Sequence, residues 1–151
     1  MKNSDTEALI DDFERWPEMD FMEGDMYEAT RLKLTQEKGE STVDCGSTIP
    51  PLSGNHISCF AGVEILFTLK QPVQSLSFDY TLTGGVTFKC LDEQKRTVPG
   101  CEARLEMPDG KDTGTQHFKS AGTSIHHLAI ALFKVTEDDN ALLQFDNLRS
   151  D

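Results

Sequence analysis

The sequence predicts an all-β protein built as a sandwich of two antiparallel sheets. Roughly eight to ten short strand-like segments are separated by turn-forming residues at the spacing that sandwiches show. The opening segment 9–16 and the closing segment 141–149 both set acidic residues between apolar ones, which favours pairing of the two chain ends. A chain of 151 residues without an internal repeat suits one domain, 1–151, with 1–8 as a candidate flexible tail.

The middle of the chain has the clearest strand patterns. Apolar and polar residues alternate in four segments, and each is predicted to be a half-buried strand with one face toward the core. In the last of them Cys101, Ala103, Leu105 and Met107 are expected to point inward, with the charged residues between them facing water. These segments are 63–70, 76–80, 86–90 and 101–107.

Glycine and proline mark the turns. Gly84-Gly85 predicts a two-residue hairpin turn, because both glycines accept the positive φ that tight β-turns require. Pro108-Asp109-Gly110 predicts a second turn, which opens a polar loop before a short strand at 115–120. The longest irregular stretch, 37–56, is expected to form loops of the kind that bind ligands on a rigid sandwich.

Two segments have ambiguous periodicity. Residues 124–135 have apolar residues at helical spacing, but the run also suits a buried strand, and we favour the strand because its neighbours are strands. Residues 4–16 offer a capping box, Ser4 with Glu7, ahead of apolar residues at helical intervals. A short N-terminal helix leading into the first strand is therefore predicted as an alternative there.

The charge is strongly acidic and uneven. The net charge is −12, and residues 1–28 carry ten acidic residues against only Lys2 and Arg15. This disfavours nucleic acid as a partner, and leaves the acidic segment as a solvated face, a source of oxygen ligands or a docking surface for a basic protein. No apolar stretch is long enough to span a bilayer and no signal peptide is visible. We expect an extracellular or periplasmic protein if a signal was removed, and otherwise a cytoplasmic one.

The four cysteines fall into two local pairs, Cys45 with Cys59 and Cys90 with Cys101. Neither pair has the short spacing of a zinc knuckle or a redox motif. If the strands around Lys95-Arg96 form a hairpin, Cys90 and Cys101 lie opposite each other at a separation that a disulfide can bridge. All four are disulfide candidates, with four reduced, mostly buried thiols as the alternative.

Acidic residues near the two chain ends suggest a cation site. Pairing of the ends would bring Asp11 or Asp12 and Glu14 close to Asp146, where several carboxylate oxygens could hold a hard cation. Without a cation, Asp146 would instead fix the strand end through hydrogen bonds.

A flat aromatic side chain is what a sandwich commonly offers to a sugar ring. Trp16 is the first candidate, with Tyr27 behind it, and core packing is the competing role for both. His126 and His127 are adjacent and point to opposite faces of a strand, so they are expected to be structural. No serine or cysteine has a recognisable base and orienting group, and the sequence predicts no enzyme.

Five segments of the chain resemble the jelly-roll modules of galactose-binding-like fold, which include non-catalytic carbohydrate-binding modules and related bacterial extracellular domains. The resemblance implies a jelly-roll β-sandwich with a structural calcium ion, held by Asp146 together with Asp12 and Glu14. Such modules are typically exported. The segments are Ile10–Glu14, Val73–Tyr80, Gly84–Asp92, Ile125–Ile130 and Phe145–Arg149.

Two functions are therefore expected in order of preference. The first is a non-catalytic binding module that recognises a glycan or cell-surface polymer through loops at one end of the sheets, with calcium as a structural cofactor. The second is a protein-interaction module of the adhesion, inhibitory or toxin-neutralising kind, whose acidic surface meets a basic protein.

Overall fold

The computed structural model describes residues 8–46, 48–137 and 140–150. Over these ranges the chain forms eleven β-strands and no helix, so none of the described residues belongs to a helix that could cross a membrane. The predicted all-β class is confirmed. The strands are β1 (Ala8–Asp11), β2 (Met19–Phe21), β3 (Met26–Glu28), β4 (Leu32–Lys38), β5 (Ser41–Asp44), β6 (His56–Phe60), β7 (Glu64–Val73), β8 (Ser75–Leu91), β9 (Thr97–Lys119), β10 (Ile125–Phe133) and β11 (Leu142–Ser150).

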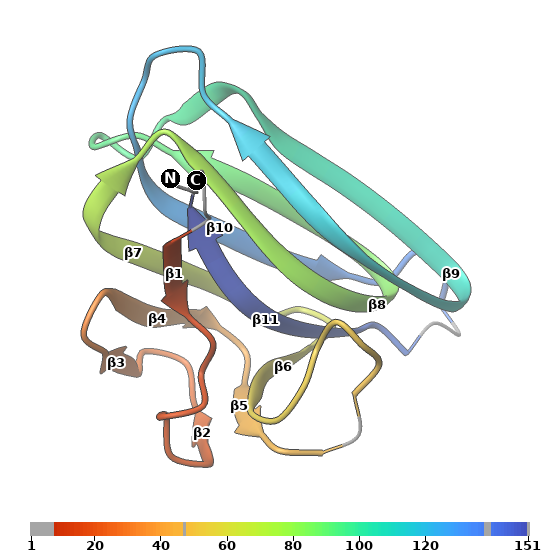
Figure 1. The fold of residues 1–151 in the computed structure, drawn as a ribbon. Helices are drawn as coiled ribbons and strands as arrows, with labels where there is room; N and C mark the ends of the chain where they lie inside the picture. The colour runs from red at the N-terminus through yellow and green to blue at the C-terminus, as the bar shows by residue number, and fades with distance from the viewer. Residues whose placement is uncertain (1–7, 47, 138–139, 151) are drawn as a thin grey trace.

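The strands form two antiparallel layers (Figure 1). The hydrogen-bonded order is β2-β5-β6-β11-β8-β10-β7-β4-β3, with β1 also paired to β11 and β9 also paired to β8. We call the layer of β2, β5, β6 and β11 the β11 sheet, and the layer of β10, β7, β4 and β3 the β10 sheet. The predicted two-sheet sandwich is therefore confirmed.

Strands β8 and β9 belong to both layers. The first part of β8 pairs with β11, through Ser77 to Thr83, and the second part pairs with β10, through Gly85 to Leu91. Strand β9 accompanies β8 along both parts. The pairing shifts at Gly84, which has φ +89°, a value that a residue without Cβ adopts readily.

The two predicted turns in this region are wrong. Gly84-Gly85 lies inside β8, where the bulge at Gly84 carries the strand from one sheet to the other instead of reversing it. Gly85 is needed for another reason, because the ring of Phe133 occupies the space where a Cβ would stand. Pro108-Asp109-Gly110 lies inside β9, where Met107 pairs with Gly84 and Asp112 with Leu82, so these residues form the matching irregularity.

The core lies between the layers and is rich in phenylalanine. Phe145 of β11 stacks on Phe67 of β7 with ring centroids 5.3 Å apart, and so joins the two sheets. Phe78 lies 4.7 Å from Phe145 and 4.7 Å from Phe88, which extends the aromatic contacts along β8. The predicted inward set of 101–107 and the preference for a strand at 124–135 are both confirmed.

The two chain ends pair as the sequence predicts. Ala8 lies opposite Ser150 and Leu9 opposite Arg149, so β1 joins the edge of β11 beyond the point where β6 ends. The predicted N-terminal helix is not formed by residues 8–16, because β1 gains the β11 edge as hydrogen-bond partner and a turn follows it at Phe13, with φ +63°. Its first residues, 4–7, lie outside the described ranges.

Replacing Gly85 by alanine tests the contact between β8 and β10. A Cβ at this position would lie 2.2 Å from Cε2 of Phe133, so the ring has to move and its cation–π contact with Arg104 is lost. We expect Gly85→Ala to lower the free energy of unfolding by about 1–3 kcal/mol in urea denaturation. Gly122→Ala is the control, since nothing lies within 4 Å of a Cβ there. Equal stability of the two variants would contradict this packing.

Candidate functional site

The outward-facing residues of the β11 sheet and of the adjoining parts of β8 and β9 are mostly polar. Four of them, Ser58, Ser77, Asp79 and Thr81, are buried, whereas Thr115 and His117 are exposed. The side chains of Leu76, Phe78 and Leu82 on β8 point into the core, so the alternate residues of that strand point outward. We call this surface the polar shelf. It consists of Ser58, Ser77, Asp79, Thr81, Thr113, Thr115, His117, Gln144, Asn147 and Arg149, which come from β6, β8, β9 and β11.

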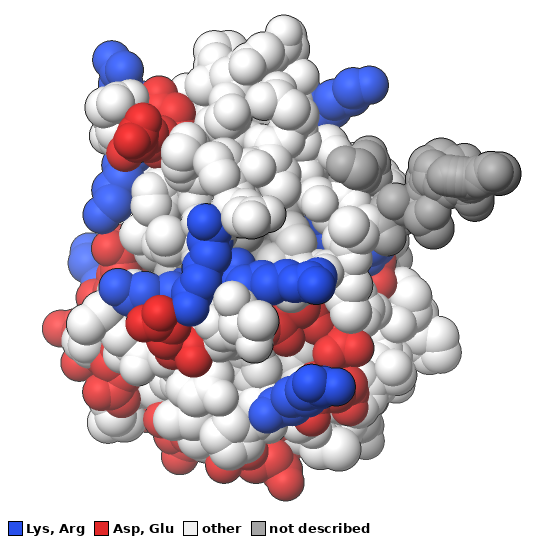
Figure 2. Space-filling model, turned by 60° about the vertical axis from the view of Figure 1, so that its left-hand side comes forward, with Lys and Arg blue, Asp and Glu red and all other residues white. Residues whose placement is uncertain are grey.

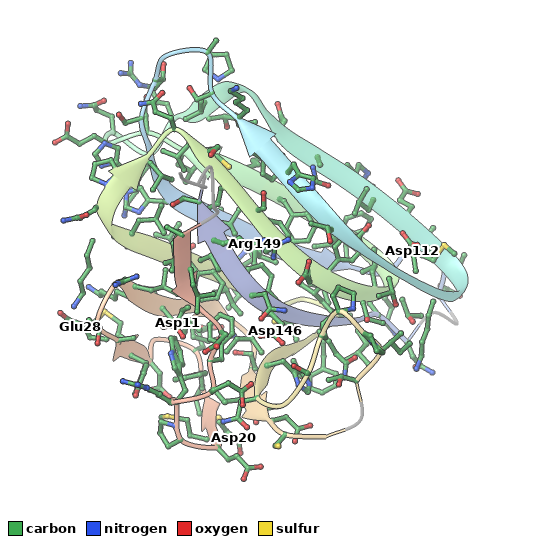
Figure 3. All side chains as sticks on the ribbon, viewed as in Figure 1. Asp11, Asp20, Glu28, Asp112, Asp146 and Arg149 are labelled. Atoms are coloured by element: carbon green, nitrogen blue, oxygen red, sulfur yellow. The ribbon has the colours of Figure 1, made fainter. Side chains whose placement is uncertain are left out.

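Asp79 is the centre of the polar shelf. Thr115 donates to its Oδ1 at 2.7 Å and Asn147 donates to its Oδ2 at 2.9 Å. Arg149 adds an ion pair, with Nη2 3.2 Å from Oδ1. The Asp79 side chain is only 6% exposed and Arg149 is 18% exposed, so this pair is shielded from water and holds the surrounding donors in place. Figure 3 shows Arg149 and Asp146 on β11.

The protonation of Asp79 is set by these bonds. Burial raises the pKa of this carboxyl, but the hydrogen bonds from Thr115, Asn147 and Arg149 together lower it more, so the net shift is downward. Asp79 therefore stays ionised at neutral pH and serves as a fixed acceptor. Further pairs flank it, with Ser77 Oγ 2.7 Å from His117 Nδ1 and Thr81 Oγ1 3.1 Å from Thr113 Oγ1.

An exposed aromatic ring lies at one end of the polar shelf. Phe60, at the end of β6, is 51% exposed and lies on the same face as Ser58, two residues earlier. It pairs with Leu142, whereas Ser58 pairs with Gln144. The distance along β11 from Leu142 to Arg149 is about 20 Å at the usual rise per residue. An apolar ring at one end and a guanidinium group at the other thus border a row of hydroxyl, amide and imidazole groups.

The predicted carboxylate cluster forms where the turn after β1, the loop before β6 and β11 meet. Asp146 is fully buried, and its oxygens accept from Ser53 N at 3.1 Å and Asn147 N at 2.8 Å. Glu14 lies against Gly54, since a Cβ there would be 2.5 Å from the Glu14 carboxylate oxygens. The structure thus brings Glu14 and Asp12 close enough to Asp146 for their charges to act on it.

Burial, together with the charges of Glu14 and Asp12, raises the pKa of Asp146 to about 7, although its two backbone hydrogen bonds act in the opposite direction. Among the described residues, no three His, Cys, Asp or Glu side chains are arranged to hold a metal ion. The three carboxylates are therefore neighbours without forming a coordination shell. Asp11, the other predicted ligand, is used elsewhere, since its Oδ2 accepts from the indole N–H of Trp16 at 2.9 Å.

Trp16 does not present a flat ring to solvent. It is 4% exposed and packs edge-on to Phe13, with centroids 5.1 Å apart, and against Tyr27, with centroids 4.4 Å apart. The prediction of Trp16 as an open platform for a sugar is thus wrong, because the core needs the ring and Asp11 binds its only polar atom. Tyr27 is half-buried.

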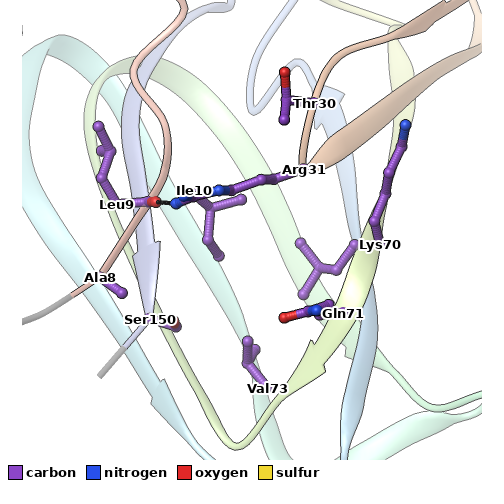
Figure 4. A pocket seen from close by; sticks show the side chains of 10 residues that line it. Ala8, Leu9, Ile10, Thr30, Arg31, Lys70, Gln71, Val73 and Ser150 are labelled. Carbon is purple, nitrogen blue, oxygen red and sulfur yellow. Dashed lines mark hydrogen bonds between the residues drawn. The ribbon is translucent and has the colours of Figure 1, made fainter.

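Trp16 and Tyr27 nevertheless line a groove between β1 and the β3–β4 turn, which we call the edge groove. It has a volume of about 860 Å³, and a neighbouring hollow of about 490 Å³ shares Leu9, Ile10, Arg31 and Lys70 with it. Arg31 crosses the gap and donates to the Leu9 carbonyl at 2.8 Å (Figure 4). Basic and acidic side chains lie side by side across the middle of this side of the molecule (Figure 2).

The cysteines are free thiols in this structure, Cys45 exposed and the other three buried. Cys59 pairs with Ser41 in the ladder between β5 and β6, so Cys45, four residues after Ser41, lies about 13 Å further along the strand. This exceeds the reach of a disulfide. Cys90 and Cys101, in contrast, are neighbours in the β8–β9 hairpin, close enough for each thiol to affect the pKa of the other.

Sequence reasoning missed the polar shelf. Ser75, Ser77, Asp79 and Thr81 form an unbroken outward set of small polar residues, and this alternation was the available signal. Their partners on β9 and β11 are more than 30 residues away in the sequence and become visible only through the register. The predicted structural role of the adjacent histidines agrees with the contact of His127 Nδ1 to Thr68 Oγ1 at 3.0 Å.

Comparison with known proteins shows a shared fold. No protein-family model and no curated protein matches this sequence. A low-affinity xylan-binding module, CBM86 from the gut symbiont Roseburia intestinalis, aligns over 84% of this chain and 93% of its own, with TM-score 0.52 and 11% identity. A mannohexaose-bound variant of the carbohydrate-binding module CBM29-2 aligns over 89% and 92%, with TM-score 0.49 and 10% identity. The first comparison shows that the chain shares the β-sandwich fold of the CBM86 module.

The raised pKa of Asp146 predicts a pH-dependent stability. The pKa of Asp146 in the folded protein lies above the unfolded value of 3.8. Its contribution to the free energy of unfolding is therefore fully present below pH 3.8 and is lost as the pH rises through about 7. Relative to Asp146→Asn, the wild-type free energy of unfolding should fall over this window by at most about 1.4 kcal/mol per pH unit. Urea denaturation in a chelating buffer measures this difference, and parallel pH profiles would contradict the shift. Asp20→Asn, an exposed change on β2, is the control.

Proposed function

We propose that this protein is a non-catalytic binding module that recognises a glycan on the polar shelf. The network around Asp79 carries the proposal, because three side chains from two other strands are fixed by one buried carboxylate before any ligand arrives. The fold shared with carbohydrate-binding modules supports it. Fixed donors and acceptors reduce the entropy lost on binding, which matters for flexible ligands such as oligosaccharides.

The chemistry of the polar shelf suits a sugar chain. Sugar hydroxyls donate and accept, and the shelf offers both functions through threonine hydroxyls, the Asn147 amide and the Arg149 guanidinium. Thr115 and His117 are exposed and so accessible to a ligand. Phe60 supplies the apolar ring on which the C–H face of a pyranose can stack. The shelf thus combines stacking with directed hydrogen bonding.

Phe60→Ala tests the position of the binding surface. After a glycan array has identified a ligand, we expect this change to weaken binding by about tenfold, or 1.4 kcal/mol, in isothermal titration calorimetry. The thermal midpoint should change little, because half of the ring is already exposed. Met26→Ala, which removes another exposed apolar side chain, is the control. Unchanged affinity of Phe60→Ala would rule out the shelf, and an array without any ligand would refute glycan binding.

The edge groove is a second candidate surface for the same ligand class. Its volume could hold part of an oligosaccharide, and Tyr27 provides a half-buried ring beside the carboxylates Asp11 and Glu28. Tyr27→Ala, measured with the same glycan, separates the two surfaces. Loss of binding in this variant alone would assign the glycan to the groove. The net charge suggested a basic protein as an alternative partner. No specific group of contacts among the described residues supports that alternative.

A structural calcium ion is the second part of the proposal. Asp12 and Glu14 lie near enough to Asp146 for their charges to add to the effect of burial on its pKa, and a bound cation would offset that repulsion. Asp12 and Glu14 would have to turn toward Asp146, since the present arrangement is not a coordination shell. Calcium prefers oxygen ligands with flexible geometry, which matches such a set.

Calcium binding predicts a concentration-dependent stabilisation. At a calcium concentration of about 100 times its Kd, the free energy of unfolding should rise by about 2.7 kcal/mol over that in chelator. Differential scanning calorimetry at constant ionic strength measures this change. Glu14→Gln should reduce the calcium effect, whereas Asp20→Asn, outside the cluster, should retain it. An equal response to magnesium and calcium, or none, would contradict a specific calcium site.

A further inference from the structure

Cys90 and Cys101 occupy the closed end of the β8–β9 hairpin. Lys89 pairs with Glu102 and Leu91 with Thr97, so Cys90 alone stands opposite residues 98–101. This bulge includes Gly100, with φ +78°, and it brings Cys101 beside Cys90. Both side chains belong to the hydrophobic core and are 0% exposed.

The two thiols are the only pair of cysteines that the fold brings into contact. Lys89 pairs with Glu102, which places Cys101 opposite Cys90, whereas Cys45 and Cys59 are separated along the β5–β6 ladder. We propose that Cys90 and Cys101 form a disulfide when the chain folds in the presence of a small disulfide donor. This inference does not depend on glycan or calcium binding.

The reaction is two successive thiol–disulfide exchanges. One cysteine thiolate attacks a sulfur of the donor, which forms a mixed disulfide and releases one donor thiolate. The other cysteine then attacks the cysteine sulfur of the mixed disulfide and displaces the second donor thiolate. The two cysteines lose two electrons and two protons in total, and the donor is reduced to two thiols.

The reaction has to occur before the hairpin is buried. Burial raises the pKa of Cys90, with a further rise from Cys101, so the folded protein holds little of the reactive thiolate. Neither thiol is accessible to a donor after folding. The same burial then protects the finished disulfide, which joins the two strands near the core.

Refolding in two glutathione buffers tests the proposal. In a mixture of reduced and oxidised glutathione, peptide mapping after alkylation of the denatured protein should find Cys90 linked to Cys101, with Cys45 and Cys59 alkylated. In reduced glutathione alone all four should be alkylated. The oxidised protein should melt about 5 to 10 °C higher than the reduced protein. Trypsin cleaves after Lys95 and Arg96, so the linked peptides separate only on reduction.

Two variants complete the test. Cys45→Ser removes the exposed thiol and should retain both the link and the difference in melting temperature. Cys101→Ser should abolish the difference. Four alkylated cysteines in the oxidising buffer, or a link that involves Cys45 or Cys59, would overturn the proposal, whether or not Cys101→Ser folds.

Discussion

The bend of the β8–β9 ribbon at Gly84 is the constraint on which the two-layer structure depends. One pair of strands contributes to both sheets, so the layers are joined by backbone hydrogen bonds as well as by side-chain packing. The bend needs a residue that accepts φ +89° and a neighbour without Cβ beneath Phe133. The two glycines meet these separate requirements. The ribbon also carries the β8 and β9 part of the polar shelf at one end and the cysteine pair at the other.

A second irregularity, in β11, determines where the candidate site lies. The register of β11 against β8 shifts between Asp146 and Arg149, and Asn147 has φ +54°. The bulge turns Asn147 and Arg149 toward Asp79 while Asp146 accepts the backbone N–H of Ser53. It therefore positions the centre of the shelf and the carboxylate cluster together. Bulges of this kind commonly re-aim side chains next to functional sites.

The sequence predicted the features that local pattern controls and failed where distant partners decide. Pairing of the chain ends and the inward set of 101–107 follow from the local pattern of apolar and polar residues, and the strand at 124–135 follows from its strand neighbours. Gly84-Gly85 has the composition of a hairpin turn, but the β10 and β11 edges on either side keep β8 extended through it. Trp16 has the residue type of a sugar platform, and only the contacts with Phe13 and Tyr27 show it to be core. The shelf itself could be identified only from the pairing register of four strands, β6, β8, β9 and β11.

The charge distribution limits what can bind on the polar shelf. Ten of the acidic residues precede position 29, whereas on the shelf the charge of Asp79 is balanced by Arg149. The more accessible shelf residues, Thr115, His117 and Asn147, offer hydroxyl, imidazole and amide groups. A ligand lying there would meet directional hydrogen-bond partners and one aromatic ring, with little net charge to attract an anion. The strongly negative remainder of the molecule would repel a polyanion from the surroundings. Because the acidic surroundings repel anions and the Asp79–Arg149 pair leaves little net charge on the shelf, a neutral glycan would suit the proposed surface better than an acidic one.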